Sequence, residues 1–152
     1  MHPADREVRR ILARSMVTRV AVRAPDGRPF LTPYWFVTDD SRICITTARN
    51  ALLARYIDTD PRVVLLFDSD RDGAPAGVLR LTGAARVHAG VPRSLRLLSR
   101  IVAQYVLNPG GLRCEIGHLH LLNLRRRFYA QSAPAWIEVA PETAMLLGGD
   151  GR

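Results

Sequence analysis

The sequence predicts a small, mainly β barrel with a few added helices. Six short apolar runs are separated by Gly, Pro and Asp, which is typical of strands joined by turns. Hydrophobic residues make up 47% of the 152 residues, and a chain of this length buries roughly 68–70% of its surface on folding. The expected strands are 17–24, 30–38, 42–47, 62–68, 78–88 and 135–139.

The whole chain, 1–152, is expected to form a single domain, with its core at about 11–140 and a loose tail over 146–152. A short amphipathic helix is expected at 3–14, because Val8, Ile11 and Leu12 recur at helical spacing. We expect this helix to cover the barrel.

The strand at 30–38 follows a Pro-Asp-Gly-Arg turn and is apolar on both faces. Its two faces carry Phe30, Tyr34 and Phe36 on one side and Leu31, Trp35 and Val37 on the other. One face can fill a barrel, while the other must meet a helix, a second subunit or a ligand. Pro33 lacks an N–H, so it marks an edge or a bulge.

The later segments are interpreted from the spacing of their apolar residues and from the positions of caps, glycines and prolines. A helix is expected at 50–57 with Asn50 as its N-cap. Gly83 predicts a bend in the strand at 78–88, whose polar face carries Arg80, Thr82, Arg86 and His88. That face either meets solvent or contacts an anionic ligand. A helix is expected from Pro92 to the Asn-Pro-Gly-Gly stop at 108–111, and another at 116–131, where a strand remains possible.

All 22 basic residues are arginines, which excludes a lysine Schiff base and a P-loop lysine. Nine arginines and one acid lie between Arg80 and Arg127, so this half is strongly basic. It can hold nucleic acid, an anionic cofactor or an acidic partner, or it is a solvated helix face. The two cysteines form no disulfide framework and no zinc spacing is present. No apolar run is long enough to span a membrane and no signal peptide is apparent, so we expect a cytoplasmic protein.

The corner at 46–50, Thr-Thr-Ala-Arg-Asn, is where a strand gives way to a helix. Free backbone N–H groups at a helix start, together with hydroxyls and an arginine, suit a phosphate. Arg55 could reach back to the same place. The alternative is an ordinary strand end followed by an N-cap.

The chain resembles the pyridoxamine 5′-phosphate oxidase-like superfamily of flavin-binding split barrels. The resemblance rests on the hairpin at 24–36 and on Ile-Thr-Thr-Ala-Arg at 45–49. It also rests on Asp-Pro-Arg-Val at 60–63 and Leu-Thr-Gly-Ala-Ala at 81–85. It implies a six-stranded antiparallel split β-barrel with short covering helices that forms a homodimer.

The resemblance also implies an FMN-dependent oxidoreductase that passes hydride to or from a small organic substrate. By the family pattern Thr46, Thr47 and Arg49 hold the phosphate, with Asn50 and Arg55 beside them. Thr32, Pro33, Tyr34 and Trp35 lie along the ring system. Two positions depart from the family, since Leu53 stands where many relatives have lysine and Tyr56 where asparagine is common; Arg55 is a possible substitute.

Other functions remain open. The same groove can hold the deazaflavin F420 or, less readily, haem, with His118 and His120 as possible ligands. The triple arginine at 125–127 beside Phe128 and Tyr129 can bind nucleic acid, which ranks last because no nucleic-acid motif accompanies it. No metal site is expected.

Overall fold

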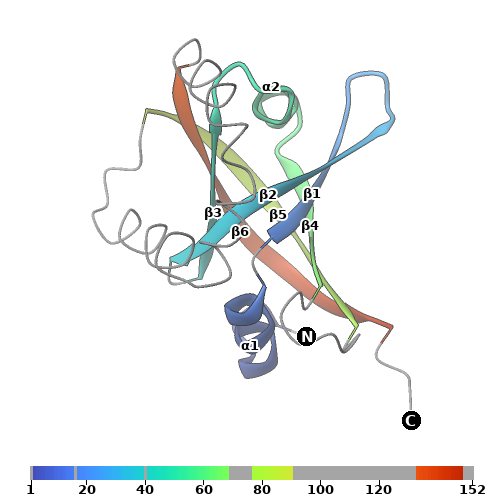
Figure 1. Cartoon of the computed structure of the whole chain (residues 1–152). Coiled ribbons are helices and arrows are strands. Elements are labelled where there is room, and N and C mark those ends of the chain that lie inside the picture. The colour runs from blue at the N-terminus through green and yellow to red at the C-terminus, as the bar shows by residue number, and fades with distance from the viewer. Residues whose placement is uncertain (1, 16, 40, 69–76, 91–132, 149–152) are drawn as a thin grey trace, which may run out of the picture.

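Six antiparallel strands close into a barrel in the order β1-β2-β3-β6-β5-β4, which confirms the predicted fold class. The computed structural model describes residues 2–15, 17–39, 41–68, 77–90 and 133–148 (Figure 1). The strands are β1 (Val17–Arg23), β2 (Pro29–Asp39), β3 (Arg42–Ala48), β4 (Arg62–Phe67), β5 (Val78–Ala89) and β6 (Pro134–Leu147). The helices are α1 (Arg6–Arg14) and α2 (Leu52–Thr59), which lie at opposite ends of the barrel (Figure 1).

The barrel interior follows the alternation of each strand. Inward side chains from all six strands form one core cluster, and Phe36 and Phe67 meet edge to face with ring centroids 4.9 Å apart. On β2 the core face is the one that carries Phe30, Tyr34 and Phe36, while Leu31 points outward and is largely exposed. The side chains buried most completely are Phe36, Phe67, Ile43, Ile45, Leu53, Leu65, Leu79, Leu81, Ile137, Val8, Val20 and Val37.

β6 differs most from the prediction, since it extends to Leu147 instead of ending at Val139. Leu146 and Leu147, assigned to a loose tail, pair with Leu79 and Val78 of β5. A bulge explains the miss, because the extra residue in β6 breaks the alternation on which strand prediction relies. The helices expected at 92–107 and 116–131, and the end of the tail at 149–152, lie outside the described residues.

The bulge lies where Gly83 predicted a bend. Thr82 pairs with Thr143 but Gly83 pairs with Pro141, so Glu142 is the extra residue in β6. At this point the β6 backbone approaches so closely that a Cβ on Gly83 would lie 2.1 Å from the carbonyl oxygen of Ala140. Only glycine allows this approach.

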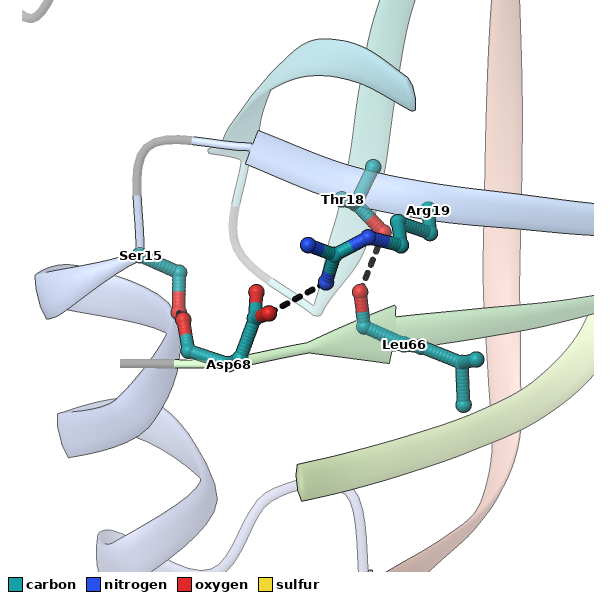
Figure 2. A network of polar contacts seen from close by, with 5 residues as sticks. All are labelled: Ser15, Thr18, Arg19, Leu66 and Asp68. Carbon is teal, nitrogen blue, oxygen red and sulfur yellow. Dashed lines mark hydrogen bonds and ion pairs between the residues drawn. The ribbon is translucent and has the colours of Figure 1, made fainter. Parts of the chain in front are cut away.

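The barrel closes between β1 and β4, where only three residues on each strand pair. Side chains reinforce this short seam (Figure 2). The buried hydroxyl of Thr18 donates to the carbonyl of Leu66 at 3.4 Å, and Ser15, just after α1, donates to the carbonyls of Ile11 and Asp68. Arg19 forms an ion pair with Asp68. The end of α1 is thereby held against the end of β4.

On the other side of the barrel the ladder between β2 and β3 is incomplete. Among the described residues, Phe36–Asp39 pair with β3, whereas the preceding half of β2 is in register with β1. Beyond Ile45, β3 pairs with β6 alone. Pro33 therefore lies on an edge of the β2–β3 ladder, as predicted, and we call the place where the described residues of these two strands cease to pair the split.

Both helices begin later than predicted. α2 starts at Leu52 with Ala51 as its N-cap, because the N–H of Ala51 donates to the carbonyl of Ala48 and places Asn50 inside a turn. The prediction that Asn50 is the N-cap was therefore wrong. α1 starts at Arg6 rather than at residue 3, and buries Val8.

Replacing Gly83 with alanine is expected to lower the free energy of unfolding by about 3 kcal/mol, because the clashing atom belongs to the backbone and cannot turn away. Gly27→Ala is the matched control. Gly27 has a positive φ of 83° but nothing within 4 Å of the added Cβ, so only about 1–2 kcal/mol is expected. Urea unfolding measures both; equal losses in the two variants would contradict the close approach.

Candidate functional site

The predicted cofactor residues lie at one end of the barrel, beside the split. Thr46 and Thr47 follow the last β3 residue that pairs with β2, and the segment 32–35 precedes the first paired residue of β2. The two sets therefore form the two sides of the same opening. The corner that follows β3 contains Arg49 and Asn50, and α2 carries Arg55.

The predicted residues divide between two faces of the sheet. Thr47 points into the barrel and is only 8% exposed, while Thr46 points outward and is exposed. Tyr34 packs against the core, whereas Trp35 packs outside it. The two threonine hydroxyls lie on opposite faces of the sheet, so one phosphate cannot bind both from the same face. A phosphate outside the barrel can bind the hydroxyl of Thr46.

An aromatic cluster lies on the outer face beside the split. Trp35 and Trp136 pack against the buried pair Val37 and Cys44. His88 stacks on Trp136 with ring centroids 4.2 Å apart and an angle of 15° between the planes. Across three strands, Thr46 is paired with Trp136 and Trp136 with His88, so these side chains form one row.

His88 carries the least satisfied polar atom in this row. Its Nε2 is buried and, in the part of the chain that the structure describes, has no hydrogen-bond partner. A buried polar atom without a partner costs free energy, which is one signature of a ligand site. The polar face of β5 was predicted from the alternation of its residues. The stack of His88 on Trp136 could not be predicted in this way, because it depends on the register between β5 and β6.

Cys44 in the same cluster is unsuited to nucleophilic chemistry. Burial raises the pKa of its thiol to about 11, and the nearby carboxylates of Glu138 and Asp39 act in the same direction. The thiol therefore stays protonated at neutral pH. Cys44 belongs to the packing of the outer face.

Arg49, in the corner after β3, contacts two groups of the protein. The N–H of Arg49 donates to the carbonyl of Ala133 at 2.9 Å, which extends the ladder between β3 and β6. Its guanidinium forms an ion pair with Asp58 at 2.7 Å, and both side chains are about half exposed. Arg55 and Asp58 are three residues apart on α2 and so share one face. Arg49 thus lies along the same exposed face as Arg55.

The start of α2 has no side-chain cap, since its N-cap is Ala51. Leu53, where many relatives have lysine, is fully buried in the core and offers no donor. Among the described residues, the donors near the split include the hydroxyl of Thr46, the exposed side chains of Arg49, Asn50 and Arg55, and the backbone N–H groups of the first turn of α2.

The Asp-Pro-Arg-Val motif has a structural role. The carboxylate of Asp60 accepts hydrogen bonds from the backbone N–H, the Nε and an NH₂ group of Arg62. These bonds lower the pKa of Asp60 to about 2. The pair stabilises the turn from α2 into β4 and takes no part in the split.

Two hollows lie away from the split. A shallow one of about 680 Å³ lies on the outer faces of β1, β4 and β5 and is lined by Arg23, Arg62 and Arg80 together with Asp60 and Glu142. The other lies beside α1. Neither includes a predicted cofactor residue.

Within the described ranges no three His, Cys, Asp or Glu side chains gather as metal ligands would. The helices described there are all too short or too polar to cross a bilayer.

Comparisons with known proteins agree with this architecture. The family model described as pyridoxamine 5′-phosphate oxidase matches residues 4–144. Among curated proteins, none matches the chain.

Among solved structures, an F420 reductase is similar with a TM-score of 0.61 and 16% identity over 90% of this chain and 94% of that one. The haem storage protein of Vibrio cholerae has a TM-score of 0.57 and 18% identity, covering 97% and 96%. An FAD-binding protein of Mesorhizobium loti has a TM-score of 0.51 and 16% identity, covering 91% and 89%. At these identities the likeness concerns the fold alone.

The variant Arg62→Gln is expected to raise the pKa of Asp60 from about 2 towards its ordinary value of 3.8. Because the pKa is lowered in the folded protein, the stabilisation is present above pH 3.8 and is lost as the pH falls through about 2. Carboxyl chemical shifts followed by NMR across this range measure the change. Arg28→Gln, in another turn, should leave the titration of Asp60 unchanged; an ordinary pKa for Asp60 in the parent protein would refute the assignment.

Proposed function

Because the chain belongs to the pyridoxamine 5′-phosphate oxidase family, we propose that it is an FMN-dependent oxidoreductase that acts on a small organic molecule. Structures of this fold include proteins named for F420 reduction, FAD binding and haem storage. The family therefore admits several cofactors, and the residues beside the split must distinguish them.

The observation that carries the proposal is the group of anion donors where β3 passes into α2. Thr46, Arg49 and Arg55 are exposed there, and no side chain caps the first turn of α2. Arginine binds phosphate through paired N–H donors, and a free helix start adds backbone donors and a favourable dipole. The donor chemistry fits the phosphate of FMN, with Thr46, Arg49 and Arg55 as its side-chain ligands.

The remaining features suit the flavin ring. In the part of the chain that the structure describes, residues 32–34 of β2 pair with β1 and not with β3, so their backbone groups on the β3 side can bond to the edge of a ring. Trp35 and Trp136 supply flat apolar surfaces on the outer face. When bound, the flavin would supply the hydride chemistry, while these residues orient the ring and exclude water. A second copy of the chain is proposed to complete the groove, as a homodimer.

Asp58 gives the proposal a specific consequence. In the structure Arg49 is paired with Asp58, so a phosphate must compete with this carboxylate for the guanidinium. The variant Asp58→Asn removes the competitor and a nearby negative charge. It is therefore expected to bind FMN more tightly, whereas Arg49→Gln is expected to weaken binding about tenfold by removing a charge-assisted hydrogen bond.

Fluorescence titration with FMN and with riboflavin measures both effects. Riboflavin has no phosphate, so its affinity should be the same in Arg49→Gln and in the parent protein. Arg28→Gln is the matched control, since Arg28 also pairs with an exposed aspartate but lies in the turn between β1 and β2. If the parent protein takes up no FMN, or if Arg49→Gln affects both ligands equally, the proposed phosphate site is wrong.

F420 in the same groove is the second candidate, favoured by the exposed arginines beside the split, which suit its anionic tail. Titration with F420 and with haem, beside FMN, separates the alternatives. Tighter binding of F420 than of FMN would replace the flavin in the proposal, while a Soret band on adding haem would indicate a haem protein.

A further inference from the structure

A second cavity lies between α1 and the end of the barrel opposite α2. Its volume is about 700 Å³, within the range typical of small-molecule sites. Leu12 and Ala13 of α1 form one wall. Ile43 and Leu81, which belong to the barrel core, form the floor together with Pro141 of β6.

The rim of this cavity is polar and basic. Arg9 and Arg42 line it, with the hydroxyl groups of Thr38 and Ser41 between β2 and β3 and the side chain of His2. Arg42 is held by Glu138 at 2.6 Å. Arg9 is exposed, and in the part of the chain that the structure describes no ion pair involves it. Arg9 is therefore the cation available to a ligand.

This cavity is separate from the split. Thr38, Ser41 and Arg42 lie where β2 turns into β3, whereas the cofactor residues lie at the other ends of these two strands. The two helices mark the two ends, with α1 beside the cavity and α2 beside the split (Figure 1). A ligand of the α1 cavity would not compete with one in the split.

An apolar floor under a basic rim selects for a molecule with an apolar body and a negative end. We propose that the cavity beside α1 binds a small amphipathic carboxylate. Its hydrocarbon chain lies against Leu12, Ala13 and Pro141, which are at least partly exposed, so that binding removes apolar surface from water. Its carboxylate binds the guanidinium of Arg9, since arginine binds carboxylates through paired hydrogen bonds.

Calorimetric titration of the full-length protein with octanoate and with 1-octanol tests this proposal. The parent protein should bind octanoate in a saturable way, and Arg9→Gln should weaken that binding about tenfold. Arg10→Gln is the matched control, because Arg10 is also exposed on α1 but does not line the cavity. Octanol lacks the charge, so Arg9→Gln should leave its affinity unchanged.

A second variant tests the cavity itself. Ala13→Trp places an indole in the wall and should reduce the binding of both octanoate and octanol, while circular dichroism confirms that the variant folds. No saturable binding by the parent protein, or equal losses in Arg9→Gln and Arg10→Gln, would overturn the proposal. It would equally be overturned if a second copy of the chain filled the cavity, in which case Ala13→Trp would lower the sedimentation coefficient.

Discussion

The close approach of two backbones at Gly83 is the constraint on which the barrel depends. With no side chain in the way, the carbonyl oxygen of Ala140 lies 2.1 Å from where a Cβ of residue 83 would be, and β6 accommodates one extra residue. The bulge bends the longest ladder of the barrel, since bulges increase local twist and re-aim the residues on either side. On one side of it β6 presents Trp136 to the split, and on the other Pro141 lines the cavity beside α1.

The ladder between β2 and β3, where the split lies, is much shorter than the ladder between β5 and β6. Among the described residues, β2 and β3 share four pairs, whereas β5 and β6 share twelve. Pro33 suits the edge that results, because it has no N–H to leave unsatisfied. The corner where β3 passes into α2 lies beside the split, and exposed Thr46, Arg49 and Arg55 are its potential anion donors.

The fold could be predicted from the sequence because its determinants are local. Alternation and turn residues indicated all six strands, and Gly83 indicated the bend. The full length of β6 was missed because the residue added at Glu142 interrupts the alternation. The cap at Ala51 was missed because a turn from Ala48 moves the helix start beyond Asn50.

The candidate site was predicted less completely. The segments that flank the split were identified, but consecutive strand residues face opposite ways, so Thr46 points outward and Thr47 into the barrel. The stack of His88 on Trp136 joins residues distant in the sequence, and the pairing of Arg49 with Asp58 joins the corner after β3 to the last turn of α2. Such contacts follow from register and chain direction, which no local pattern encodes.

The pairing of β3 with β6 has a consequence for how the chain is made. Ile43 lies beside Val139, so β3 emerges from the ribosome long before its neighbour exists. Until β6 arrives, the nascent sheet presents an open edge that can pair with other chains. Contacts between such distant residues also slow folding, because a long loop must close before they form. Pairing with β6 therefore covers the edge of β3 only after the later part of the chain has been made.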